Sequence, residues 1–333
     1  MFNLKKIFSP KKPSRSTHSQ GCAFPPELIL ESGSHKITVR DIDQSFSGYL
    51  LGVNSLIDTD MNHLEQEVIR QLNTLLQQDL QSSELLPRLP RVLPKLMQVL
   101  RDEESTAKDI AALVEEDPVL VAELIRLINS PYYRTSQKVL SLRQATVLLG
   151  REGMRKLVAS AVVKPLLNVR QGHFMKLSSR TLWEHSEKTA IAASRFCNQD
   201  EESAFHAYLA GILQNIGLTV GLKIMDSVFD GSEAPNSILF HETFTAACRK
   251  LSSEIVKTWT MPVSIYQAFS APDTDDNSLD PSGLEISLFV SDRIAKAQIL
   301  GERISIDPQD VRILLNSEPC QACRASLDEI CPA

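Results

Sequence analysis

The chain contains 333 residues, of which 43% are hydrophobic and 23% are charged, and this composition excludes a largely disordered protein. Its net charge of −6 excludes a broad nucleic-acid surface, because binding to duplexes needs clustered Lys and Arg. No run of residues approaches the ~18 consecutive apolar residues of a membrane span, and no secretory signal follows the first lysines. We therefore expect a cytoplasmic protein that neither binds nucleic acid nor spans a membrane.

The first 22 residues are predicted to form a basic flexible tail. Lys and Arg are concentrated in the first fifteen positions, and Pro10 and Pro13 interrupt any long helix there. Apolar residues stand between the lysines, so a weak and reversible contact of this tail with an anionic membrane surface stays open.

Residues 23–81 are predicted to be an accessory region in front of the main domain. A short strand is expected at residues 35–40. Across residues 62–80, apolar side chains recur at steps of three and four, which predicts an amphipathic helix. The proline-rich segment 86–94 comes next, and proline favours an extended backbone in the residue before it. We therefore place the start of a second domain here, which covers residues 86–300.

Helix-capping signals follow one another in this second domain. Thr106 and Ser141 each stand three residues before an Asp or a Gln, as in a capping box. Asp117 is followed by a proline, which suits the first position of a helix. Gly150 is predicted to end the helix that Ser141 begins. The region is expected to be all-helical with short connections.

Three further helices are predicted to carry the polar residues of interest. The first begins near residue 182 and includes His185. The second covers residues 205–216, which are apolar on nearly all sides, as expected for a helix at the centre of a bundle. The last strong helix spans residues 287–300 and includes Asp292.

Residues 301–333 are predicted to be a C-terminal tail. Three of the six cysteines lie in it, namely Cys320, Cys323 and Cys331. Their spacing begins like a zinc site but has no fourth ligand nearby. A chain of this length without a signal peptide does not need disulfides, so reduced thiols are expected.

Six segments between residues 86 and 300 occur in a distinctive order, namely LPRLPRVLPKLMQVL, IAALVEEDPVLVAELIRLINSPYY, SLRQATVLLGREGMRKLV, LWEHSEKTAIAA, AYLAGILQNIGL and VSDRIAK. Together they resemble the HD-related output domain (HDOD) of bacterial signalling proteins, a noncatalytic relative of the HD metal-dependent phosphohydrolases. The resemblance implies a fold dominated by α-helices, in which an HDOD-like helical bundle follows a small N-terminal accessory region. It does not extend to residues 1–80.

By this resemblance, four residues stand at the positions of the HD metal ligands. His185 is at the first histidine, Gln214 and Asn215 are at the His-Asp doublet, and Asp292 is at the final aspartate. Amides carry no charge and bind divalent ions only weakly through their carbonyl oxygens. We therefore predict a vestigial metal pocket with no catalytic residue, no metal and no cofactor. Buried amides are expected to form interhelical hydrogen bonds instead.

A second candidate site follows a predicted helix and contains Asn129, Ser130, Pro131, Tyr132 and Tyr133. The two tyrosine rings offer a large contact area, and their hydroxyl groups need partners, a combination typical of binding surfaces. These residues are our candidates for binding a partner protein. Packing of the tyrosines in the core is the competing interpretation.

Together, these features favour a non-catalytic bacterial signal-transduction or regulatory protein. It is expected to act through protein–protein contacts of its HDOD-like domain, with signalling proteins of unknown identity as partners. One alternative is an HD-type phosphohydrolase, which requires a metal ion that activates water. Another is a nucleotide-binding sensor with a vestigial site. The input signal and the oligomeric state do not follow from the sequence.

Overall fold

The computed structural model describes residues 39–78, 105–130, 138–168, 171–197, 200–269 and 283–303, together with scattered residues between 80 and 99. The predicted basic tail and the three C-terminal cysteines lie outside these ranges. So do Pro131, Tyr132 and Tyr133 of the second candidate site.

All named elements in the described ranges are helices, which confirms the expected all-α fold. In chain order they are α2 (Val39–Leu51), α3 (His63–Gln77), α5 (Ala107–Glu115), α6 (Pro118–Ile128), α7 (Leu142–Leu167), α8 (His173–Phe196), α9 (Glu201–Leu213), α10 (Ile216–Val228), α11 (Ile238–Thr258), α12 (Val263–Gln267) and α13 (Leu284–Arg303). One isolated parallel bridge joins Ile57 to Ser237.

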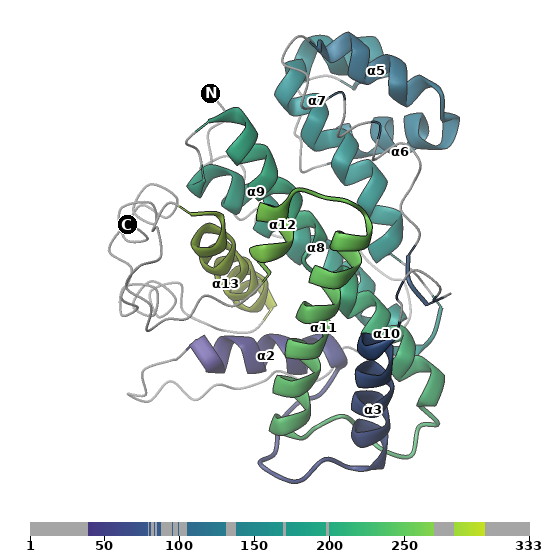
Figure 1. Cartoon of the computed structure of the whole chain (residues 1–333), viewed down its shortest axis with the longest axis vertical. Coiled ribbons are helices and arrows are strands. Elements are labelled where there is room, and N and C mark those ends of the chain that lie inside the picture. The colour runs from purple at the N-terminus through teal and green to yellow at the C-terminus, as the bar shows by residue number, and fades with distance from the viewer. Residues whose placement is uncertain are drawn as a thin grey trace, which may run out of the picture.

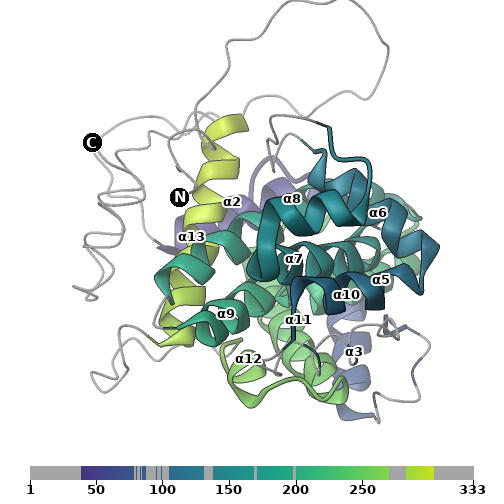
Figure 2. The ribbon, with the colours of Figure 1, turned by 90° about the horizontal axis from the view of Figure 1, so that it is seen from above.

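Helix α8 lies at the centre of the bundle and contacts α2, α9, α10 and α13 (Figure 1). Helices α5, α6 and α7 group together at one end, and α3 lies beside α10 and α11 at the other. The view from above shows α13 crossing the ends of the central helices (Figure 2). Helix α13 packs on α8, α9 and α2, so it closes one side of the core.

Two glycines allow neighbouring helices to touch through their backbones. A Cβ atom at Gly211 of α9 would lie 2.4 Å from Ala190 Cα of α8. A Cβ atom at Gly217 of α10 would lie 2.1 Å from the carbonyl oxygen of Cys248 in α11. Both distances are far below van der Waals contact, so only glycine fits at these helix crossings.

The capping signals read from the sequence are largely confirmed. Asp117 accepts hydrogen bonds from the N–H groups of Val119 and Leu120, and Thr106 forms a complete capping box with the Asp three residues later. Ser141 caps α7, but the Gln of the expected box bonds to the N–H of the residue before Ser141. Gly150 has a φ of 64° and separates two helical parts of α7.

The N-terminal region differs from the expectation of a strand. Helix α2 starts at Val39, so the expected strand is wrong at residues 39 and 40, whereas residues 35–38 lie outside the described ranges. Ile42, Phe46 and Leu50 are buried and four residues apart, a spacing that fits a helix. The predicted helix after it is confirmed as α3, with Asn62 as its N-cap.

Helices α2 and α3 share the core of the main bundle. Leu50, Val68 and Leu72 belong to the same buried cluster as the apolar residues of α8 to α11. Buried Glu65 of α3 accepts a hydrogen bond from the N–H of Ser237, just before α11. The described part of the N-terminal region, residues 39–78, therefore covers one side of the bundle.

Helix α8 begins at His173, nine residues before the start that the sequence suggested. Its first turn is capped by a distant residue, because Asp226 in α10 accepts hydrogen bonds from the N–H groups of Phe174 and Met175. The central apolar helix is confirmed as α9. It ends at Leu213, so the amide pair lies at the junction of α9 and α10 and not inside a helix.

Among the described residues, one segment is long and apolar enough to cross a membrane, namely Glu201–Val228, which contains α9 and α10. Most of it lies inside the bundle, since 83% of its most apolar window is buried. Central helices of a folded bundle have the same composition, so this finding is weak evidence for a span.

Candidate functional site

One pocket opens between α2, α8, α11, α13 and the junction of α9 and α10. Water-sized molecules can occupy about 70 Å³ of it. Its lining contains all four residues that the resemblance placed at the metal position, His185, Gln214, Asn215 and Asp292. The fold thus brings together residues from three separate parts of the sequence.

His185 is buried at the floor of this pocket, with 1% of its surface exposed. Its Nδ1 atom lies 2.9 Å from Asn215 Nδ2, and its Nε2 atom lies 3.1 Å from Asp292 Oδ1. The amide group can only donate through Nδ2, so Nδ1 is the acceptor and Nε2 carries the proton that points to Asp292. Both ring nitrogens are therefore occupied within the protein, and the ring of Phe46 in α2 packs 4.7 Å from the imidazole.

Asp292 is held by positive charges of its own helix. Lys296 Nζ lies 2.7 Å from Asp292 Oδ2 and forms an ion pair with it, although the geometry does not allow a hydrogen bond. Arg293 Nη1 lies 3.8 Å from the same oxygen. Burial by itself would raise the pKa of Asp292, but Lys296, the hydrogen bond from His185 and Arg293 hold it well below its usual range. Asp292 is therefore an ionised carboxylate with its charge already balanced.

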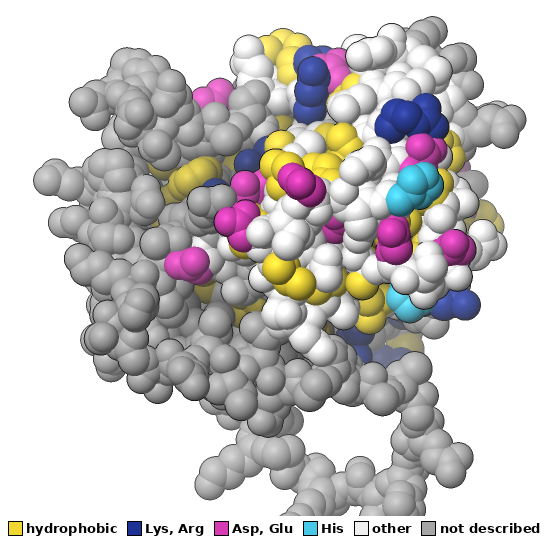
Figure 3. Space-filling model, turned by 90° about the horizontal axis from the view of Figure 1, so that it is seen from below, with side chains coloured by type: hydrophobic (Ala, Val, Ile, Leu, Met, Phe, Trp, Pro, Cys, Tyr) yellow, Lys and Arg dark blue, Asp and Glu magenta, His cyan; other side chains and the backbone are white. Residues whose placement is uncertain are grey.

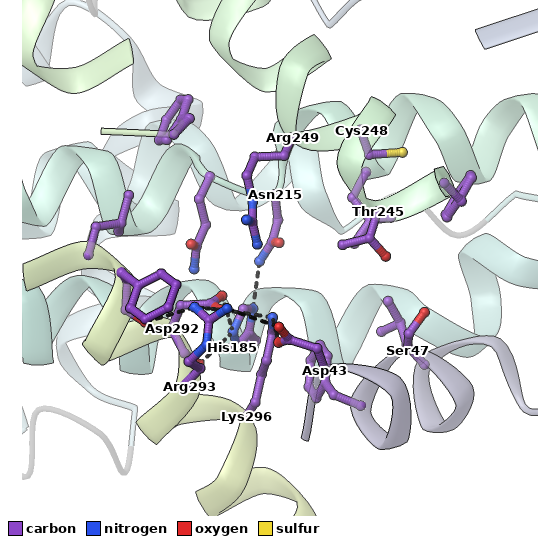
Figure 4. Close-up of a pocket in the computed structure, with 18 of the residues that line it drawn as sticks. Asp43, Ser47, His185, Asn215, Thr245, Cys248, Arg249, Asp292, Arg293 and Lys296 are labelled. Atoms are coloured by element: carbon purple, nitrogen blue, oxygen red, sulfur yellow. Dashed lines mark hydrogen bonds and ion pairs between the residues drawn. The ribbon is translucent and has the colours of Figure 1, made fainter. Parts of the chain in front are cut away.

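Asp43 of α2 completes this charge network from the other side. Its carboxylate lies 2.7 Å from Lys296 Nζ and 3.0 Å from Arg293 Nη2. Two buried cations of α13 thus stand between two carboxylates, one from α13 and one from α2 (Figure 4). Sequence reasoning missed Asp43 and Lys296. The step of four residues from Asp292 to Lys296 was a signal for one ion pair, but nothing local pointed to Asp43.

The two amides of the predicted doublet have different surroundings. Asn215 Nδ2 also donates to Ser186 Oγ over 2.9 Å, so this side chain joins the start of α10 to α8 through two hydrogen bonds. Gln214 Nε2 is buried and has no hydrogen-bond partner among the described residues. The expected interhelical bonds are therefore present for Asn215 and absent for Gln214.

The donor set does not fit a divalent metal ion. Within the described ranges, no group of three or more His, Cys, Asp or Glu side chains is arranged to hold one. Asn215 turns its donor group towards His185, and the ammonium group of Lys296 lies where a cation would be needed next to Asp292. A metal ion bound beside Asp292 would face the positive charges of Lys296 and Arg293, which already pair with both nearby carboxylates.

At the second candidate site, the described residues have a structural role. Asn129 Nδ2 donates to the carbonyl oxygen of Val139 over 2.7 Å, and Val139 N–H donates to Asn129 Oδ1 over 2.8 Å. This pair joins the end of α6 to the residues before α7. Ser130 is partly buried, and neither it nor Asn129 lines the pocket.

Comparison with known proteins assigns the bundle to a family. A model of the HDOD domain family matches residues 86–273. The chain belongs to the HDOD family. The matched part contributes His185, Gln214 and Asn215 to the pocket, whereas Asp43 and Asp292 come from α2 and α13, outside the match. Helices that flank the HDOD match therefore complete the pocket.

One curated relative matches a large part of this chain. An uncharacterised curated protein of Treponema pallidum (strain Nichols) is 22% identical over 196 residues, which cover 58% of this chain and 35% of that protein. The match thus spans about a third of the length of that relative.

Three crystal structures share the fold. An HDOD domain protein of unknown function from Geobacter sulfurreducens has a TM-score of 0.54 at 18% identity, over 80% of this chain and 100% of the other. A proposed metal-dependent phosphohydrolase from Shewanella amazonensis SB2B has a TM-score of 0.51 at 16% identity, over 80% and 99%. A proposed signal transduction protein from Marinobacter aquaeolei VT8 has a TM-score of 0.50 at 19% identity, over 80% and 63%. At these identities the likeness concerns the fold alone.

Proposed function

We propose that this HDOD protein is a non-catalytic regulator in signal transduction, which works in the cytoplasm through contacts with other proteins. The ion-pair network of the pocket is the observation that carries the proposal. Lys296 and Arg293 pair with Asp292 and Asp43, next to the residues that the family resemblance assigns to a metal site. The relative from Marinobacter aquaeolei VT8 is itself named for signal transduction.

The chemistry of hydrolysis supports this choice. A metal-dependent phosphohydrolase lowers the pKa of a bound water and stabilises the charge that develops on the phosphoryl oxygens. Both tasks need a cation held by anionic or imidazole ligands. Here the imidazole of His185 bonds to Asn215 and Asp292, and the carboxylate of Asp292 bonds to cations of the protein. Neither group is free to hold an ion or to accept a proton from water.

Exposed apolar side chains on α6, on α7 and just before α7 support the proposal that the protein acts by binding other proteins. Four large apolar side chains are exposed there, with relative exposures of 78% for Val119, 69% for Leu140, 82% for Val147 and 51% for Leu148. Apolar side chains exposed on neighbouring helices can take part in contacts with other proteins. The predicted element at residues 129–133 joins α6 to α7 in the same part of the chain.

One face of the molecule can be compared with the basic surface that nucleic-acid binding needs. Figure 3 shows the face below α2 and α3, where the described acidic, basic and apolar side chains alternate without a continuous basic area. This distribution agrees with a net charge of −6 and supports proteins as partners.

One observation favours a second candidate, an HD-type phosphohydrolase. His185 and Asp292 still lie 3.1 Å apart, and the relative from Shewanella amazonensis SB2B is named as a proposed phosphohydrolase. The first experiment therefore measures the metal content of the purified protein and its cleavage of bis(p-nitrophenyl) phosphate with added manganese. We expect substoichiometric metal and no cleavage above that of His185→Ala. About one metal ion per chain, with cleavage that His185→Ala abolishes, would establish the enzyme instead.

A second experiment tests the contacts. The full chain with Val147→Asp should lose protein partners that the unchanged chain retains from native cells, because a carboxylate would enter an apolar interface. Val263→Asp on α12 is the matched control, since this valine is also exposed. Equal retention by the unchanged chain and both variants would argue against this surface.

A further inference from the structure

Arg249 is a cation of the pocket that no described carboxylate balances. It lies on α11, is partly buried and lines the pocket. Arg293 and Lys296 each pair with both Asp43 and Asp292, whereas Arg249 has no ion pair or hydrogen bond within the described ranges. Among the described lining residues, three cationic side chains therefore meet two carboxylates, which leaves one positive charge in excess.

The position of Arg249 relative to the ion pairs makes it available to a ligand. Figure 4 shows Arg249 and Asn215 on one wall of the pocket, opposite Asp43 and Lys296 on the other. Its guanidinium group is thus separated from the two carboxylates by the space of the pocket. A planar guanidinium offers several N–H donors in a fixed fork, which suits the oxygens of a phosphate or carboxylate group.

A second donor lines the same pocket. Gln214 Nε2 is buried and has no acceptor among the described residues. A buried N–H group without an acceptor is costly, so such groups in native proteins call for a specific explanation. Gln214 and Arg249 line the same pocket, so an anionic group bound there would offer this amide an acceptor and balance the excess charge.

We propose that the pocket binds a phosphate group, without a metal, through Arg249 and the amide of Gln214. The inference rests on the proposed function, because a pocket that does not hydrolyse its ligand can serve as the input site of a regulator. A tetrahedral phosphate has oxygens for donors from several directions, which suits side chains on α11 and at the end of α9. Water-sized molecules can occupy about 70 Å³ of the pocket, which is room for a group of about the size of phosphate.

Titration calorimetry on the full chain in buffer with EDTA tests this site. The probes are inorganic phosphate, AMP and adenosine. We expect heat of binding and an increased melting temperature with inorganic phosphate and with AMP, and neither with adenosine, because adenosine lacks the anionic group. Tighter binding of AMP than of inorganic phosphate would identify a nucleotide as the source of the phosphate, whereas equal affinity would identify the free ion.

Three variants test whether phosphate binds at Arg249 and Gln214 or is attracted by positive charges elsewhere on the protein. Arg249→Gln should weaken phosphate binding by at least about 10-fold, because it removes charge-assisted hydrogen bonds. Gln214→Glu should have a similar effect, since it replaces a donor with an anion of almost the same shape. Arg180→Gln is the matched control, because Arg180 of α8 is exposed and does not line the pocket. This control should bind like the unchanged chain.

The inference is overturned if neither inorganic phosphate nor AMP binds, if adenosine binds as tightly as AMP, or if Arg249→Gln or a folded Gln214→Glu binds like the unchanged chain. Circular dichroism shows which variants are folded. Failure here is distinguishable from failure of the proposed function. A chain that binds no phosphate but retains partners through Val147 would keep its regulatory role and lose only this input site.

Discussion

Glu187 is a buried carboxyl group of α8, and replacing it with Gln should change how the stability of the protein depends on pH. Its exposure is 8%, and burial raises its pKa from 4.5 to about 7. The positive charge of Lys164 and a hydrogen bond from Trp183 oppose this rise without cancelling it. Lys164 Nζ lies 4.9 Å from the centre of the Trp183 ring, so the three side chains form one contact between α7 and α8.

The direction of the effect follows from proton binding. Between pH 4.5 and about 7, the folded chain keeps a proton on Glu187 that the unfolded chain has released. The free energy of unfolding therefore falls as the pH rises through this range, and the contribution is flat above it. A difference of this size in pKa corresponds to about 3 kcal/mol. Glu187→Gln has no proton to lose, so its stability lacks this decline.

Urea denaturation of the unchanged chain and of Glu187→Gln checks this prediction at pH values from about 4.5 to about 7.5. Subtracting the two free energies cancels the other titrating groups, because they are common to both chains. The difference should move by about 3 kcal/mol in favour of Glu187→Gln as the pH rises. Glu115→Gln, at an exposed position of α5, is the control. If the two curves run parallel, burial does not hold this carboxyl group protonated and the reasoning is refuted.

Three other outcomes are expected. Gln214→His with Asn215→Asp and Lys296→Ala should bind a divalent metal, measured by elemental analysis, because His185 and Asp292 would complete a ligand set; unchanged metal content would contradict the pocket assignment. Leu124→Ala should lower the free energy of unfolding by about 2–5 kcal/mol, since Leu124 is fully buried, and a change near zero would place it on the surface. Gly211→Ala should cost about 1–3 kcal/mol or more in chemical denaturation, because its methyl group would strike the backbone of α8.

The local features of this protein were available from the sequence. The N-caps at Thr106 and Asp117 and the break at Gly150 depend on hydrogen bonds and backbone angles within a few residues. The apolar spacing of α3 and α9 depends on the helical repeat alone. The family resemblance added the positions of His185 and Asp292, which no local pattern distinguishes from packing residues.

Features set by distant contacts were missed or misplaced. Helix α8 begins earlier than its own sequence suggests, because Asp226 of α10 caps its first turn. The start of α2 was read as a strand, although its apolar face is buried against α13 and α8. In both cases the helix is stabilised by contacts with another helix, and these contacts cannot be read from the local sequence.

By itself, the sequence predicted a helical fold of the HDOD family, and the resemblance placed the amides of Gln214 and Asn215 at two metal-ligand positions. Only the tertiary structure decided what surrounds them. Asp43 is 253 residues from Lys296 in the chain, yet their side chains lie 2.7 Å apart because α2 packs on α13. The partner of a buried charge depends on which helices pack together, and so does the absence of a described partner at Arg249. The charge of the pocket is therefore a property of the folded bundle.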